Sequence, residues 1–163
     1  MGSEMCIRDR KEHQLFEYDD LAAKTDAATE RFHTLAGDIQ QTEAELSRVS
    51  DLMAAVVQYA KTRPAFDGYK AAKYSRKYLA EHEAELADYR AAKATMAELL
   101  GGEKLPKMDV LKEKRRQLAA RKKALYLEYR KAQQDMRELV AVKGSVDHLR
   151  GLTDNQRNKE QAR

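Results

Sequence analysis

Between Leu21 and Ala60 the sequence is LAAKTDAATERFHTLAGDIQQTEAELSRVSDLMAAVVQYA, in which apolar or small residues recur at alternating steps of four and three. A seam of this kind, sustained over several heptads, is typical of a coiled coil. At about 1.5 Å per residue such a helix would be about 60 Å long. The seam consists of Leu21, Thr25, Ala28, Phe32, Leu35, Ile39, Thr42, Leu46, Val49, Met53, Val56 and Ala60.

Helix-breaking residues divide the rest of the chain. Pro64 predicts the end of a first helix over about 13–63, because the residue before a proline disfavours the α region. Ser75 is a suitable N-cap for a second helix over 75–100. Gly101-Gly102 supplies its C-terminal stop.

A third helix is predicted over about 108–143, with heptad-spaced leucines beginning at Leu111. Short connections between helices favour antiparallel neighbours. We therefore expect an all-α fold, a long antiparallel helical hairpin or three-helix coiled-coil-like arrangement over 13–150. The polar ends, 1–12 and 151–163, are expected to be disordered.

The composition agrees with long solvated helices. Of the 163 residues, 36% are charged and 7% aromatic, and none is Trp. No run of about 18 apolar residues exists, so we expect no membrane insertion, and no apolar signal-peptide core follows Met1. The single Cys6 excludes an internal disulfide and suits a reducing compartment, so a cytoplasmic location is expected.

Motifs for chemistry are missing from the sequence. The histidines are scattered singly, and Leu86 stands where a zinc-protease helix beginning at His82-Glu83 needs its second histidine. His82 is therefore interpreted as a packing residue. Gly101-Gly102-Glu103-Lys104 lacks the spacing of a phosphate-binding loop. We predict no catalytic residue, no metal site, no cofactor and no enzymatic activity.

Positive charge is concentrated between Lys104 and Lys131. This stretch holds eleven cations and three anions, a net charge of 11 − 3 = +8, whereas the whole chain carries +4 and the remainder therefore about −4. Such a stripe can neutralise several phosphates and bind DNA without sequence preference. The candidate DNA- or partner-binding residues are Lys112, Lys114, Arg115, Arg116, Arg121, Lys122 and Lys123.

A purely structural role for these cations is the alternative. They would then face acidic residues across the hairpin, namely Glu43, Glu45, Glu81, Glu83 and Glu85. Tyr126 and Tyr129 leave a similar choice, since their rings can stack on bases or lie at the edge of a core.

Residues 5–10, MCIRDR, resemble the translation of an adapter used in preparing sequencing libraries. If this segment is an artefact, Met1 is not the natural start, and a larger protein has lost its N-terminal part.

Two stretches carry a resemblance to a family. They are KYSRKYLAEHEAELADYRAAKATM, from Lys73 to Met96, and KLPKMDVLKEKRRQLAARKKALYLEYRKAQQDMRELVAVKGSVDHL, from Lys104 to Leu149. Both resemble the C-terminal helical region of relaxases, the mobilization nucleases of conjugative elements, especially those of Firmicutes. The likeness extends from about Leu21 to the NKEQAR ending.

The resemblance implies a parent enzyme that nicks DNA at a transfer origin with a tyrosine nucleophile and a histidine-held metal. Neither can be carried over to a residue of this sequence. It implies for this chain a bacterial, non-catalytic tail that contacts DNA near the origin, relaxosome proteins or the coupling protein.

Two other hypotheses stay open at this point. One is a stand-alone structural coiled-coil scaffold that self-associates through the Leu21 to Ala60 seam. The other is a small basic nucleic-acid-binding module that acts through Lys112 to Lys123.

Overall fold

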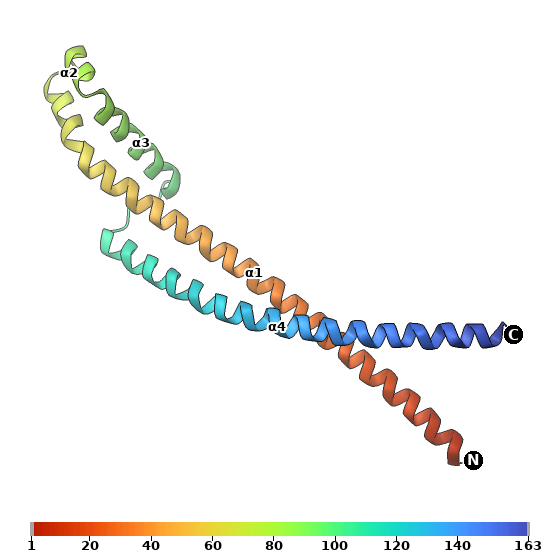
Figure 1. Cartoon of the computed structure of the whole chain (residues 1–163). Helices are drawn as coiled ribbons and strands as arrows, with labels where there is room; N and C mark the ends of the chain where they lie inside the picture. Colours follow the sequence, from red (N-terminus) through yellow and green to blue (C-terminus); the bar gives the residue numbers. More distant parts are fainter. Residues whose placement is uncertain (1, 163) are drawn as a thin grey trace. The chain divides into compact units, whose positions relative to one another are not determined.

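The residues that the structure describes form four helices, which Figure 1 labels in chain order: α1 (Gly2–Ala71), α2 (Arg76–Glu81), α3 (Glu83–Leu100) and α4 (Met108–Gln161). This computed structural model describes the backbone of residues 2–162 and the side chains of residues 17–152 and 155–162. No strand occurs among the described residues, and the prediction of an all-α fold is confirmed.

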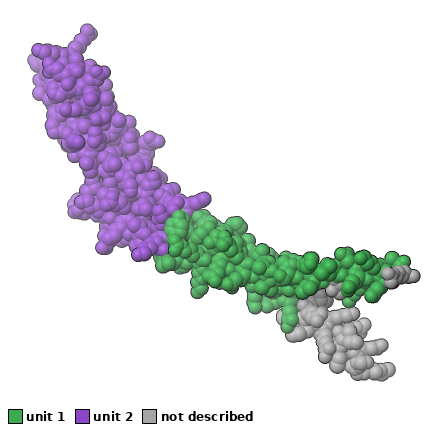
Figure 2. All heavy atoms as spheres, in the orientation of Figure 1, with its two compact units in different colours: residues 1–39, 124–163 green, residues 40–123 purple. Residues whose placement is uncertain are grey.

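The helices contribute to two compact units, coloured separately in Figure 2. Unit 1 comprises residues 1–39 and 124–163, from the first part of α1 and the second part of α4. Unit 2 comprises residues 40–123, which include α2, α3 and the adjoining parts of the two long helices. Each unit is described by itself.

Unit 2 has its core where three helices meet. Val49, Leu52 and Met53 of α1 form a buried cluster with Leu111 and Leu118 of α4. The end of α3 packs against this cluster through Met96, Leu99 and Leu100, and Arg48 donates a hydrogen bond to the carbonyl oxygen of Leu99 at 3.1 Å. The predicted antiparallel packing of the first and third helices therefore holds within this unit.

Stacked rings occupy the other part of unit 2. Tyr89 of α3 lies between Tyr59 and Phe66 of α1, with ring centroids 5.1 and 4.3 Å away. Tyr78 of α2 stacks on Tyr69 of α1 and donates a 2.8 Å hydrogen bond to the carbonyl oxygen of Ala65. These rings join α1 to the α2–α3 segment.

The prediction that Pro64 ends the first helix is wrong, because α1 continues through it to Ala71. A proline removes one hydrogen bond of the helical ladder. The turn that follows Pro64 contributes buried Ala65 and the rings of Phe66 and Tyr69 to the packing described above. Burial of these side chains outweighs the loss of one hydrogen bond.

The second predicted helix is divided at His82. Ser75 does precede α2, although its side chain makes no capping bond, and His82 separates α2 from α3. Gly101 ends α3 in the left-handed conformation, with φ 56°, and its N–H donates to the carbonyl oxygen of Ala97. The predicted glycine stop is confirmed.

Unit 1 is an antiparallel pair of helices. Phe32 of α1 stacks on Tyr129 of α4, with centroids 4.9 Å apart. Tyr18 donates a 2.5 Å hydrogen bond to Asp147, and the guanidinium of Arg150 lies 4.0 Å from the Tyr18 ring centroid. The pKa of the Asp147 carboxyl lies below its usual value, chiefly because Tyr18 donates this hydrogen bond.

The Leu21 to Ala60 seam is largely used within the chain. Leu35, Ile39, Val49 and Met53 are buried. Thr25 is also buried, and its hydroxyl donates to the carbonyl oxygen of Leu21 at 2.7 Å. These seam residues are therefore occupied in packing within the chain.

The predicted ends of the helical region also differ from the structure. Helix α4 runs past 143 to Gln161, so most of the expected tail 151–163 is helical. Gly144 does not stop it, since one interior glycine costs only about 1 kcal/mol, and Lys143 pairs with Asp147 one turn on. Helix α1 is assigned from Gly2. The side chains of the expected tail 1–12 and of the adapter-like residues 5–10, and the whole of Met1 and Arg163, lie outside the described residues.

Candidate nucleic-acid interface

The seven predicted binding residues all lie on the first part of α4, within unit 2. The helix begins after the Gly101-Gly102 stop, with Asp109 in its first turn, where an acidic side chain suits the helix dipole. Leu111 and Leu118, one heptad apart, bury α4 in the core of unit 2. The cations between and beyond these two leucines are thereby fixed on the remaining surface of the helix.

Helical spacing gathers the cations on both sides of the buried leucines. Lys112, Arg116 and Lys123 are four and seven residues apart and so share one face. Lys114 and Arg121, also seven apart, share another. Because the 11 residue-to-residue steps from Lys112 to Lys123 span only about 17 Å of helix, the seven positive charges are confined to a short length of surface.

Six of the seven side chains are exposed, and Lys122 is half-buried. Lys122 pairs with Glu43 of α1 at 3.4 Å, and Arg116 with Glu113 of its own helix at 2.9 Å. The remaining five lie on both sides of the buried leucines and form no ion pair with any described residue; together they are called the basic face: Lys112, Lys114, Arg115, Arg121 and Lys123.

Among the side chains that the structure describes, the expected pairing across the hairpin is made at one position. Of the five acidic partners suggested by the sequence, Glu43 does pair with a candidate cation. Within the described part of the chain, Glu45, Glu81, Glu83 and Glu85 form no ion pair with any of the seven. Ion pairing with these five acidic residues therefore involves one of the seven cations.

Tyr126 and Tyr129 belong to unit 1 and are half-buried. Tyr129 stacks on Phe32, and Tyr126 makes an edge contact with Tyr129 at 6.4 Å between centroids. Their position at the edge of a core is thus confirmed.

His82 is likewise a packing residue, as predicted. Its ring stacks on Tyr78 at 4.0 Å, and Nδ1 lies 3.1 Å from the Tyr78 carbonyl oxygen. Among the side chains that the structure describes, no three of His, Cys, Asp or Glu gather as a metal site would require. None of the helices has, in its described residues, an apolar stretch of the length needed to cross a bilayer.

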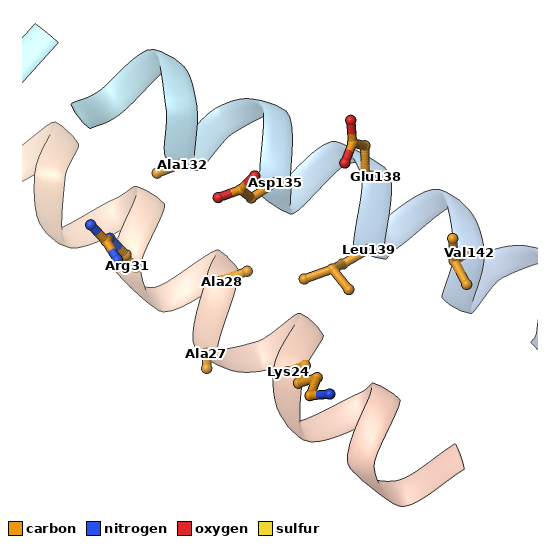
Figure 3. A pocket seen from close by; sticks show the side chains of 9 residues that line it. All are labelled: Lys24, Ala27, Ala28, Arg31, Ala132, Asp135, Glu138, Leu139 and Val142. Atoms are coloured by element: carbon orange, nitrogen blue, oxygen red, sulfur yellow. The ribbon is translucent and has the colours of Figure 1, made fainter. Parts of the chain in front are cut away.

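Sequence reasoning missed a groove in unit 1, between α1 and α4 (Figure 3). Its volume is about 560 Å³. From α1 it is lined by Lys24, Ala27, Ala28 and Arg31, and from α4 by Ala132, Asp135, Glu138, Leu139 and Val142. A signal in the sequence that could have indicated it is that Asp135, Val142 and Leu149 follow one another at seven-residue steps.

No protein-family model, no curated protein and no solved structure gives a significant match to this chain.

Proposed function

We propose that the chain is a non-catalytic helical segment that holds DNA without sequence preference through the basic face of α4. The observation that carries the proposal is the exposure of these five cations without acidic partners among the described residues. Keeping five like charges so close together on a helix is unfavourable by itself, whereas a polyanion would release counterions on binding them.

The setting in which the segment would work is the mobilisation of conjugative DNA. This part of the proposal rests on the likeness of Lys73 to Met96 and Lys104 to Leu149 to the C-terminal region of bacterial relaxases. The segment would hold DNA near a transfer origin, beside relaxosome or coupling proteins, in the cytoplasm. Recovery of the uninterrupted gene tests this: the segment should follow a nuclease domain with a histidine cluster, and an upstream reading frame without that domain would refute the relaxase origin.

DNA contact is tested on the full chain by fluorescence anisotropy with a random-sequence duplex over a range of salt concentrations. If about four of the cations each neutralise a phosphate, the slope of log affinity against log salt should be about −4. Replacing all five residues of the basic face by Gln should bring the slope close to zero and lower the affinity at least about a hundredfold at low salt.

The matched control carries the same loss of charge elsewhere in unit 2, at exposed cations of α1, α2 and α3: Lys61, Arg76, Lys77, Arg90 and Lys93, each replaced by Gln. It should retain most of the salt slope. Equal losses in the two variants would show that only net charge matters, and an unchanged slope in the basic-face variant would refute DNA binding at this face.

A further inference from the structure

Unit 1 leaves part of its apolar surface uncovered. The buried side chains among its described residues are Thr25, Leu35, Ile39 and Ala132, whereas unit 2 has a third helix that contributes Leu86, Tyr89 and Ala92 to its core. On α4 of unit 1, Val142 is 52% exposed and Leu149 62%. Two antiparallel helices alone rarely cover a seam on both sides.

The exposed apolar residues continue one wall of the groove. Val142 lines the groove itself, and Leu149 follows it one heptad later on the same face of α4. Leu152, 49% exposed, lies three residues further, at the next position of a four-and-three pattern. This spacing is that of a helix-packing seam on α4.

The two rims of the groove carry opposite charges, and these charges indicate which partner would bind there. The α1 rim carries Lys24 and Arg31, and the α4 rim carries Asp135 and Glu138 (Figure 3). All four of these residues are exposed. Between the rims, α1 contributes the small side chains of Ala27 and Ala28, which allow another helix to approach closely.

The antiparallel register brings the charges to matching levels. The hydrogen bond from Tyr18 to Asp147 fixes one level along the helix pair, and the stack of Phe32 on Tyr129 fixes another. Lys24 and Arg31 of α1 lie between these two levels. Glu138 and Asp135 of α4 lie between them as well. Two copies can pack groove to groove in two ways. If α1 of each copy lies along α4 of the other, cations meet anions at four positions; if α1 lies along α1, like charges meet.

We infer that the groove of unit 1 is the site at which a second copy of this chain docks, with α1 of each copy against α4 of the other, forming an antiparallel four-helix contact. The contact is isologous, so Lys24 and Arg31 of one copy pair with Glu138 and Asp135 of the other, and the reverse. The inference does not depend on DNA binding, which was assigned to unit 2.

The test is a pair of charge reversals in the full chain, followed by sedimentation velocity over a range of concentrations. The wild-type chain should dimerise. Lys24→Glu with Arg31→Glu, or Asp135→Lys with Glu138→Lys, should each weaken the dimer at least about tenfold, because every intermolecular pair becomes repulsive. Mixing the two variants should restore a dimer, since each rim then meets its opposite in the other chain.

A wild-type chain that stays monomeric at the highest concentrations would overturn the inference, and so would variants that dimerise normally or fail to recover on mixing. Circular dichroism checks that the reversals leave the helices intact. If the charge reversals disturb the helices, Val142→Gln provides a second test. Its control is Val140→Gln, since Val140 is 49% exposed on a different face of α4. Val142→Gln should weaken the dimer and Val140→Gln should not; equal effects would contradict the assigned face.

Discussion

Gly37 and Gly68 both lie inside α1, but only one of them has room for a methyl group. A Cβ at Gly37 would have no neighbour within 4 Å, whereas a Cβ at Gly68 would lie 2.2 Å from the hydroxyl oxygen of Tyr78. Gly37→Ala should raise the free energy of unfolding by about 1 kcal/mol, the usual difference in helix propensity.

Gly68→Ala gains the same propensity but must displace the Tyr78 ring, which stacks on Tyr69 and His82 and bonds Ala65. We expect this loss to cancel or exceed the gain, so that the variant is no more stable than wild type. Urea unfolding followed by circular dichroism measures both variants. An equal gain at the two positions would show that Tyr78 yields without cost.

At the scale of the element, the hydrogen bond from Tyr18 to Asp147 joins α1 to α4 in unit 1. The pKa of Asp147 is lowered chiefly by the hydrogen bond from Tyr18, with smaller contributions from Lys143 and Arg150. Because the folded pKa lies below the ordinary value, this contact stabilises the fold above that ordinary value, near pH 4, and is lost as the pH falls through the lowered one.

Tyr18→Phe should therefore move the pKa of Asp147 up toward its ordinary value and reduce stability at neutral pH, with the difference from wild type vanishing in acid. A carboxyl-carbon NMR titration gives the pKa directly. Tyr74→Phe, at a ring 60% exposed in unit 2, should leave the Asp147 titration unchanged. An unmoved Asp147 pKa in Tyr18→Phe would mean that the bond is not formed in solution.

The elements themselves were predictable where the signal is periodic or local. Heptad spacing identified the buried faces of α1 and α4, including Leu35, Ile39 and Leu111, and Gly101 identified a helix end. Pro64 misled because the proline rule is local, whereas the continuation of α1 depends on rings of α2 and α3 that are distant in sequence. The break at His82 was not predictable either, because no glycine or proline stands at that position.

The same distinction applies to the candidate interface. Counting charges located the cations of α4, because concentration of charge is a property of sequence. Which of them find partners depends on the side of the helix each occupies: Lys122 reaches Glu43, while Lys123, the next residue, has no ion pair among the described residues. The groove of unit 1 depends on the spacing of two helices and could not be derived from either alone.

At the scale of the whole molecule, the two units differ in how much they bury. Unit 2 has a three-helix core around Val49, Met53 and Leu111, whereas unit 1 has two helices and exposed apolar residues on α4. Backbone amides near Val49 and Met53 should therefore exchange more slowly with solvent than amides of α1 around Lys24, because opening a smaller core costs less free energy.

Hydrogen exchange followed by mass spectrometry measures this difference, and its dependence on protein concentration separates the two units further. If two copies dock at the groove, protection of 24–31 and 135–149 should rise with concentration, while protection around Val49 and Met53 in unit 2 should not change. Val142→Gln should reduce the rise, because it weakens the dimer by removing one apolar contact without touching the packing of unit 2. Uniform exchange in both units at all concentrations would instead indicate one cooperative body that gains nothing from a second copy.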